Sequence, residues 1–144
     1  MKVKTLFNHN EHDGHNENQL LDCSEELIAR VLDCAFEVHR ELGPGLLESV
    51  YEQAMVLEIA AKGLACDRQV EVVAHYKGRE LGIGFRADIV VDGRLLIELK
   101  AVDVLNAAHL AQTMTYLRLL KMKRGLLLNF NNRLLKEGIK RVVI

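Results

Sequence analysis

The sequence predicts a mixed α/β (α+β) domain in which helices flank a mixed β-sheet. Three segments carry apolar residues at helical spacing: 25–42, 46–62 and 106–120. Five others alternate or run apolar at strand length, with turn residues between them, and these are 64–77, 81–91, 95–100, 125–130 and 139–144. The expected order is therefore helix, helix, three strands, helix and two strands, which is typical of one mixed sheet with packed helices.

The 144 residues are enough for one domain, which we place at residues 21–144. Residues 1–20 are rich in Asn, His, Asp and Glu and have no apolar period, so we expect a disordered or loosely attached arm. Its His9, His12 and His15 recur every third residue, as in metal-binding tracts, but a solvated tail is the preferred interpretation.

Composition excludes several classes of protein. No apolar run approaches the roughly 18 residues that span a bilayer, and the N-terminus lacks the apolar segment of a signal peptide. Three widely spaced cysteines without a CxxC pair favour reduced thiols. We therefore expect a cytoplasmic protein with no membrane partner.

Charge is unevenly distributed along the chain. Residues 1–99 carry a balance of −8 and residues 100–144 a balance of +7. This asymmetry favours a basic C-terminal surface for a polyanion, although a solvated end without a partner is the alternative.

The first two helices have clear boundaries. Asp22 or Ser24 can cap the first helix, and Gly43-Pro44-Gly45 ends it. The second helix runs from about 46 to 62 and stops at Gly63. The side chains expected to face the core are Leu27, Ile28, Val31, Cys34, Ala35, Val38 and Leu42 in the first helix, and Leu47, Val50, Ala54, Leu57 and Ala61 in the second.

The helix at 106–120 connects two strands. Its expected core residues are Ala107, Leu110, Ala111, Met114 and Leu117. Gln112 and Tyr116 stand one turn apart on another stripe. Because a crossover helix joins parallel neighbours, the strand at 125–130 should lie parallel to a hairpin arm. The last strand, 139–144, should form an edge that can pair across a two-fold axis, which makes a homodimer possible.

The hairpin at 85–100 carries charge where a plain hairpin would be apolar. Both apolar faces meet one core only if the loop has an odd number of residues. A loop of Val91, Asp92 and Gly93 fits and places Asp88 opposite Leu96, with Glu98 as its diagonal neighbour. A two-residue turn would instead put Asp88 beside Ile97 and separate the acidic side chains.

Asp88, Glu98 and Lys100 then share one face of this hairpin. Two converging carboxylates repel unless a cation lies between them, and Mg²⁺ accepts one or two carboxylates plus waters. Lys100 points to the same face, where it can orient an attacking water. The alternative is a surface hairpin with a solvated Glu–Lys pair, which contributes little to stability.

Several motifs occur together in the chain. They are Gly45-x-x-Glu48-x-x-Tyr51, Asp88, Glu98-x-Lys100, Gln112-x-x-x-Tyr116, Asn129-Phe130 and Leu135-Lys-x-Gly-Ile-Lys-Arg141. This set resembles the bacterial GxxExxY family of the PD-(D/E)XK nuclease-like superfamily, and the Gln-x-x-x-Tyr element resembles that of RecB-type nuclease domains. The resemblance covers about residues 25–144. One departure is Asn131, where the family pattern has glycine.

The resemblance implies a restriction-endonuclease-like core and hydrolysis of DNA or RNA. It implies that Asp88 and Glu98 bind Mg²⁺ or Mn²⁺, with Glu48 completing the site and the main-chain oxygen of Leu99 a further ligand. Lys100 would position the nucleophilic water. The same resemblance gives Gln112 and Tyr116 the role of orienting Lys100 or holding the nucleic-acid backbone. The alternative is a catalytically silent binding or oligomerisation module with the same fold.

Overall fold

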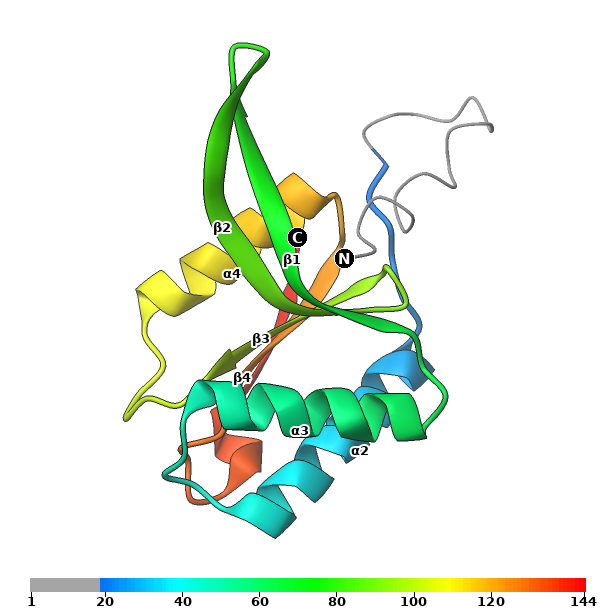
Figure 1. Ribbon diagram of the computed structural model, residues 1–144, viewed down its shortest axis with the longest axis vertical. Coiled ribbons are helices and arrows are strands. Elements are labelled where there is room, and N and C mark those ends of the chain that lie inside the picture. The colour runs from blue at the N-terminus through cyan, green and yellow to red at the C-terminus, as the bar shows by residue number, and fades with distance from the viewer. Residues whose placement is uncertain (1–18) are drawn as a thin grey trace.

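Residues 19–144, apart from the side chain of Ile83, are described by the computed structural model (Figure 1). The arm predicted for residues 1–20 lies almost wholly outside this range. Leu21 already belongs to the domain, because it forms a parallel bridge with Met122.

The elements follow the predicted order. They are α2 (Glu25–Leu42), α3 (Glu48–Ala61), β1 (Cys66–Tyr76), β2 (Arg79–Val91), β3 (Leu95–Lys100), α4 (Ala107–Leu120), β4 (Arg124–Asn129), a short 3₁₀ helix η1 (Leu135–Gly138) and β5 (Ile139–Val143). Only η1 was not expected. The predicted fold class, a mixed sheet with flanking helices, is confirmed.

The five strands form one sheet in the order β1-β2-β3-β4-β5. All neighbours are antiparallel except β3 and β4, which are parallel and joined through α4. This is the arrangement expected of a crossover helix. Strand β5 lies at an edge, as predicted.

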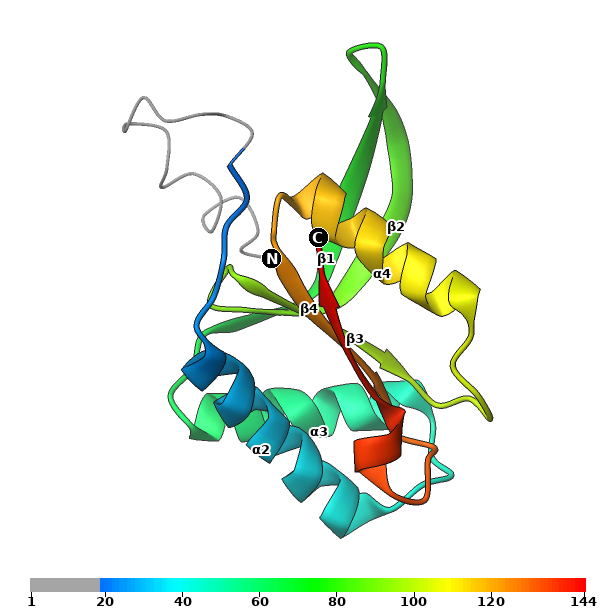
Figure 2. The same cartoon turned by 180° about the vertical axis from the view of Figure 1, so that it is seen from behind.

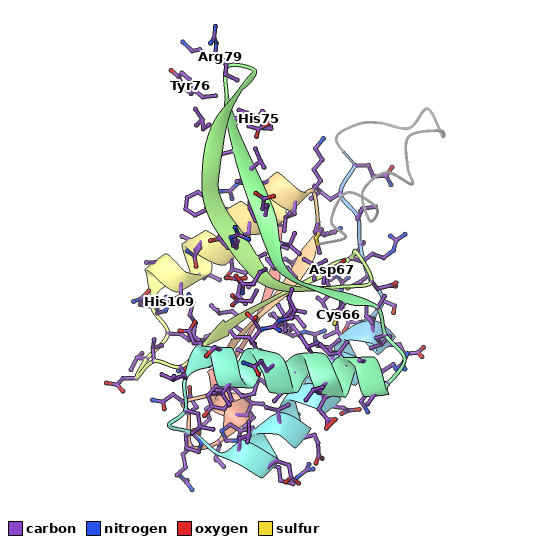
Figure 3. All side chains as sticks on the ribbon, viewed as in Figure 1. Cys66, Asp67, His75, Tyr76, Arg79 and His109 are labelled. Carbon is purple, nitrogen blue, oxygen red and sulfur yellow. The ribbon has the colours of Figure 1, made fainter. Side chains whose placement is uncertain are left out.

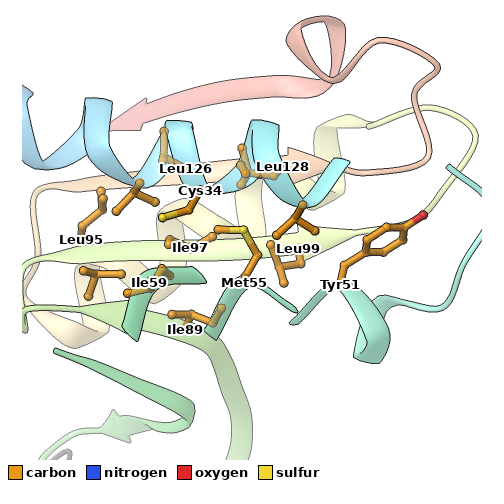
Figure 4. Packing of buried hydrophobic residues seen from close by; sticks show 14 of the residues in the cluster. Cys34, Tyr51, Met55, Ile59, Ile89, Leu95, Ile97, Leu99, Leu126 and Leu128 are labelled. Atoms are coloured by element: carbon orange, nitrogen blue, oxygen red, sulfur yellow. The ribbon is translucent and has the colours of Figure 1, made fainter. Parts of the chain in front are cut away.

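Helices cover both faces of the sheet: α2 and α3 pack on one, and α4 on the other (Figures 1 and 2). On the first face, Cys34 and Met55 pack against Ile97 and Leu128 (Figure 4). Burial of each large apolar side chain of this kind stabilises the fold by roughly 1.5–3 kcal/mol.

Helix α2 follows its predicted pattern. Ser24 is the N-cap and accepts a hydrogen bond from the Leu27 amide at 3.1 Å, while Gly43 ends the helix with a positive φ of 67°, which glycine adopts without penalty. The predicted core face is buried, except that Leu42 is 38% exposed.

The core faces predicted for the other two helices are largely wrong, and of the predicted residues only Leu117 is buried. Helix α3 buries Tyr51, Glu52, Met55 and Ile59, whereas the expected Leu47 and Leu57 are each 73% exposed. Helix α4 buries Thr113, Tyr116, Leu117 and Leu120; of the expected core residues, Ala107, Leu110 and Ala111 are exposed. Both helices carry apolar residues on every side, so periodicity cannot choose the buried face.

The hairpin between β2 and β3 has the predicted parity but a shifted register. Val91 pairs with Leu95 and Ile89 with Ile97, so the three-residue loop is 92–94 and not 91–93. Asp92 and Gly93 both have positive φ, and the Asp92 amide donates to the carbonyl of Ala65 at 2.7 Å. The shift brings Asp88 level with Glu98 and not with Leu96.

Tyr51 fixes the loop between α2 and α3. Its hydroxyl donates to the Gly43 carbonyl at 2.6 Å and accepts from the Leu46 amide at 3.1 Å. Its ring stacks on Phe130, with 4.7 Å between the ring centroids. Asn131, the departure from the family pattern, accepts a hydrogen bond from the Gly45 amide at 3.1 Å and so holds the same loop.

Two further observations bear on the composition arguments. Cys23, Cys34 and Cys66 are free, and burial raises the pKa of each thiol. Within residues 19–144, no helix is both long enough and apolar enough to cross a membrane.

We predict that Gly138→Ala destabilises the protein while Gly84→Ala does not. A Cβ at position 138 would lie 2.5 Å from the Asn129 carbonyl oxygen, which is main chain and cannot swing aside. The expected loss is about 1–3 kcal/mol in the free energy of unfolding, measured by urea titration. A Cβ at position 84 meets nothing within 4 Å, so Gly84→Ala is the matched control. Equal effects of the two changes would contradict the packing described for η1.

Candidate active site

Strands β2 and β3 separate at Asp88. Their ladder ends at the pair Ile89–Ile97. Beyond it, the Asp88 amide donates to Oε2 of Glu98 at 2.8 Å, and the Leu99 amide donates to Oδ2 of Asp88 at 2.8 Å. Each carboxylate therefore takes the place of a main-chain carbonyl as the acceptor. We call this reciprocal pair of hydrogen bonds the carboxylate bridge.

Gln69 of β1 lies on the other side of Asp88. Its neighbours Arg68 and Val70 pair regularly with β2, but Gln69 itself has φ 49°. A non-glycine residue in this left-handed region costs on the order of 1–3 kcal/mol and is enriched at functional sites. Its side-chain amide nitrogen donates to Glu52 Oε1 at 2.6 Å and lies 3.5 Å from Asp88 Oδ1.

Glu52 of α3 is a buried acid that the sequence analysis missed. It is 6% exposed, and Nε and Nη2 of Arg68 donate to its Oε2 at 3.0 and 2.8 Å. With Gln69 on the other oxygen, both oxygens have donors, as a buried carboxylate requires. The available signal was its position one turn after Glu48, which places the two acids on neighbouring helix positions.

A pocket of about 370 Å³ opens beside Asp88. It is lined by Glu48, Ser49, Glu52, Gln69, Asp88 and Leu99, from α3 and the first three strands. Glu48 is exposed at the first turn of α3, so its carboxylate borders the same space as Asp88. Two of the three predicted metal-binding residues, Glu48 and Asp88, therefore line this pocket, where a ligand can reach them.

Lys100, Gln112 and Tyr116 form a second group on the α4 side. The Lys100 ammonium lies 3.4 Å from the side-chain oxygen of Gln112. Tyr116 is only 4% exposed and packs against Phe85, with ring centroids 5.7 Å apart. None of these three lines the pocket beside Asp88, and β3 connects the two groups through Glu98 and Lys100.

The acid pair is strongly perturbed. Burial is the main cause that raises the pKa of Asp88 to about 6; the charge of Glu52 acts in the same direction, and the hydrogen bond from the Leu99 amide opposes the shift. Burial and then the charge of Asp88 raise the pKa of Glu98 to about 8, against the Asp88 amide and Lys100. Two desolvated carboxylates therefore compete for one lysine, and the pair keeps a proton near neutral pH.

The same charges reach Tyr116. Burial is the main cause that raises the pKa of its phenol to about 12, and the charges of Glu98 and Asp88 add to it. Tyr116 is therefore a neutral hydrogen-bond donor at physiological pH, electrostatically coupled to the acid pair.

The donor chemistry fits a hard divalent cation. Mg²⁺ needs only one or two carboxylates, with waters and substrate oxygens completing its shell, and a cation would displace the shared proton of Asp88 and Glu98. Among residues 19–144, no three His, Cys, Asp or Glu side chains are grouped closely enough to hold a metal by themselves. The acid pair, and not a set of three acids with Glu48, is therefore the part of the predicted site that these residues bring together.

Comparisons with known proteins give one match. A family model described as the PD-(D/E)XK nuclease superfamily matches residues 25–142. No curated protein and no solved structure matches the chain.

We predict that, in EDTA, the melting temperature falls as pH rises from 5.5 to 8.5. Both acids have a higher pKa in the folded protein than in the unfolded chain, so the folded state binds more protons and loses stability as pH rises through about 6 to 8. We expect a fall on the order of 5 °C by scanning calorimetry. Glu98→Gln, which keeps an acceptor for the Asp88 amide but does not ionise, should flatten the profile. Superimposable profiles for the two proteins would refute the coupling.

Proposed function

This chain belongs to the PD-(D/E)XK nuclease superfamily, and from that premise we propose that it hydrolyses phosphodiester bonds of DNA or RNA with Mg²⁺ or Mn²⁺. The observation that carries the proposal is the carboxylate bridge, which holds the Asp88 and Glu98 carboxylates side by side and largely out of water. Lys100 alone does not balance the charge of two carboxylates. Such a pair is suited to bind a divalent cation beside a phosphate.

The roles of the acids follow from their places in the site. Asp88 and Glu98 would hold the ion, and Glu48, which lines the pocket beside Asp88, would add a carboxylate to the site. A bound divalent ion supplies Lewis acidity and lowers the pKa of its water. Gln69, fixed by Glu52, keeps the Asp88 carboxylate in place.

The α4 side supplies the groups that act on water and phosphate. Lys100 positions the attacking water and counters the charge that develops on the phosphate. Gln112 orients the Lys100 ammonium, and the neutral Tyr116 phenol donates a hydrogen bond toward the acid pair or the phosphate backbone.

We also infer the finer assignment to the GxxExxY family, because its remaining motif residues have a common structural role. Tyr51 and Phe130 stack, and Asn129 both donates to and accepts from the main chain of Val102, at 2.8 and 3.0 Å. These contacts fix the loops that follow α2 and β3. A cytoplasmic location and a homodimer through the β5 edge stay predictions.

The second candidate is a silent binding module, and one observation favours it. Asp88 and Glu98 satisfy main-chain amides, so the fold needs them whether or not chemistry takes place. This candidate binds nucleic acid without metal, with affinity that falls steeply as salt rises.

We predict metal-dependent cleavage of labelled DNA or RNA in Mg²⁺ or Mn²⁺ and none in EDTA. Asp88→Asn and Lys100→Ala should each lower the rate by at least about 100-fold, because they remove an ion ligand and the group that positions water. Asp33→Asn and Lys62→Ala, which make the same changes at exposed positions on α2 and at the end of α3, are the matched controls. Cleavage that survives Asp88→Asn or Lys100→Ala would mean that the activity belongs to another site or a contaminant.

We predict that Mn²⁺ binding, measured by isothermal titration calorimetry, is lost in Asp88→Asn and retained in Asp33→Asn. Because the acid pair must release its proton, the affinity should rise about tenfold or more between pH 6 and 8. A wild-type titration without heat at pH 8 would favour the silent module over the nuclease.

A further inference from the structure

The hairpin of β1 and β2 extends well beyond the rest of the sheet. Strand β2 has 13 residues, but only Ile89, Val90 and Val91 pair with β3. Its remaining length pairs with β1 alone, and Figure 1 shows this ribbon projecting past α4 into solvent. We call residues 73–86 the β-arm.

The tip of the β-arm carries cations and an exposed aromatic ring. Tyr76 is 60% exposed, and the Lys77 ammonium lies 5.3 Å from the centroid of its ring. Arg79 pairs with Tyr76 across the turn of Lys77 and Gly78. Figure 3 places His75, Tyr76 and Arg79 at the far end of the ribbon. None of these residues belongs to either hydrophobic core cluster.

The charge of the β-arm contrasts with its surroundings. Between residues 19 and 99 there are eight Lys and Arg residues and fifteen Asp and Glu residues. Residues 76–86 hold three of these cations, namely Lys77, Arg79 and Arg86, and a single acid, Glu80. The β-arm is thus the basic part of an otherwise acidic stretch, which suits a polyanionic partner.

Two bulges interrupt the β-arm. His75 pairs with Glu80 but Val73 pairs with Ile83, so β2 has one extra residue between these two pairs, at Gly82. The next pair is Val72–Phe85, which leaves Gly84 as a second extra residue of β2. Gly82 has φ 71°, a conformation that glycine adopts without penalty. Bulges bend a ribbon and increase its twist, and they often re-aim it near a functional site.

We propose that the β-arm inserts into the major groove of duplex DNA and holds it across the active site. This rests on the proposed function, since it assumes that the partner is the nucleic acid to be cleaved. A two-stranded ribbon fits the major groove of B-DNA, about 12 Å wide, whereas the deep, narrow groove of A-form RNA excludes it. Lys77 and Arg79 bind phosphates along the groove, and Tyr76 contacts the sugars or base edges between them.

The reach of the β-arm matches this role. Arg79 and Asp88 stand nine positions apart in β2, which corresponds to roughly 30 Å of strand. At about 3.4 Å per base pair, this spans eight or nine base pairs. One duplex can therefore contact the tip and the acid pair together, because the same strand carries both.

The test measures binding in EDTA, so that no cleavage is needed. A fluorescein-labelled 20-base-pair DNA duplex is titrated with wild type and with the double variant Lys77→Ala/Arg79→Ala, and anisotropy is followed from 50 to 300 mM salt. We expect the variant to bind about tenfold or more weakly at 50 mM salt, with a salt slope smaller by about 2 because two phosphate contacts are lost. Tyr76→Ala should weaken binding with the slope unchanged. Duplex RNA should bind more weakly than duplex DNA, and the variants should have little effect on it.

The control is Arg40→Ala/Lys62→Ala, which removes two exposed charges at the C-terminal ends of α2 and α3, outside both the β-arm and the basic C-terminal stretch. Equal losses in both double variants, no binding of duplex DNA by wild type, or a change only in self-association by sedimentation would each overturn the proposal. Failure of the nuclease proposal has a different signature: duplex DNA binds through the β-arm, but no cleavage follows in Mg²⁺ or Mn²⁺. Unchanged melting temperatures show that the variants are folded.

Discussion

The carboxylate bridge is the constraint on which the site depends. At the point where β2 leaves β3, two main-chain amides lose their ladder partners, and leaving one buried amide unpaired costs about 1–3 kcal/mol. Asp88 and Glu98 accept these hydrogen bonds, so the strands separate without orphaned donors. The separation has two results: the carboxylates meet in a desolvated gap, and β2 is free to continue with β1 alone as the β-arm. One local exchange of acceptors thus creates both the candidate metal site and the projecting hairpin.

Much of the architecture could be predicted from the sequence because its signals are local. The cap at Ser24 and the stop at Gly43 set the ends of α2, and the crossover through helix α4 sets β4 parallel to β3. The parity argument for the hairpin holds because shifting a strand by one residue would turn its apolar face to solvent. It does not distinguish registers that differ by two residues, because these keep the same side chains on the same face. The prediction therefore placed Asp88 opposite Leu96 and not opposite Glu98.

The rest depends on contacts between distant residues, which no local pattern contains. Helix α3 turns Tyr51 inward because the ring stacks on Phe130, about eighty residues later, and this rotation buries Glu52. Gln69 reaches Asp88 only because its backbone is left-handed within a strand, for which a glutamine gives no signal. The acids and Lys100 were accessible to sequence reasoning because they lie on one hairpin. Among their partners, Glu52 of α3 had only its spacing from Glu48 as a signal, and Gln69 of β1 had none.

The dual use of the two acids affects how divergent relatives should be interpreted. A lineage that abandoned catalysis would still be under selection to retain both carboxylates, because the sheet needs their oxygens. Within the described part of the chain, the Lys100 ammonium hydrogen-bonds a side-chain amide and no main-chain group, so mutation could remove it without opening the sheet. A pseudoenzyme derived from this fold should therefore be recognised by a substituted lysine next to intact acids, and intact acids alone are poor evidence of activity.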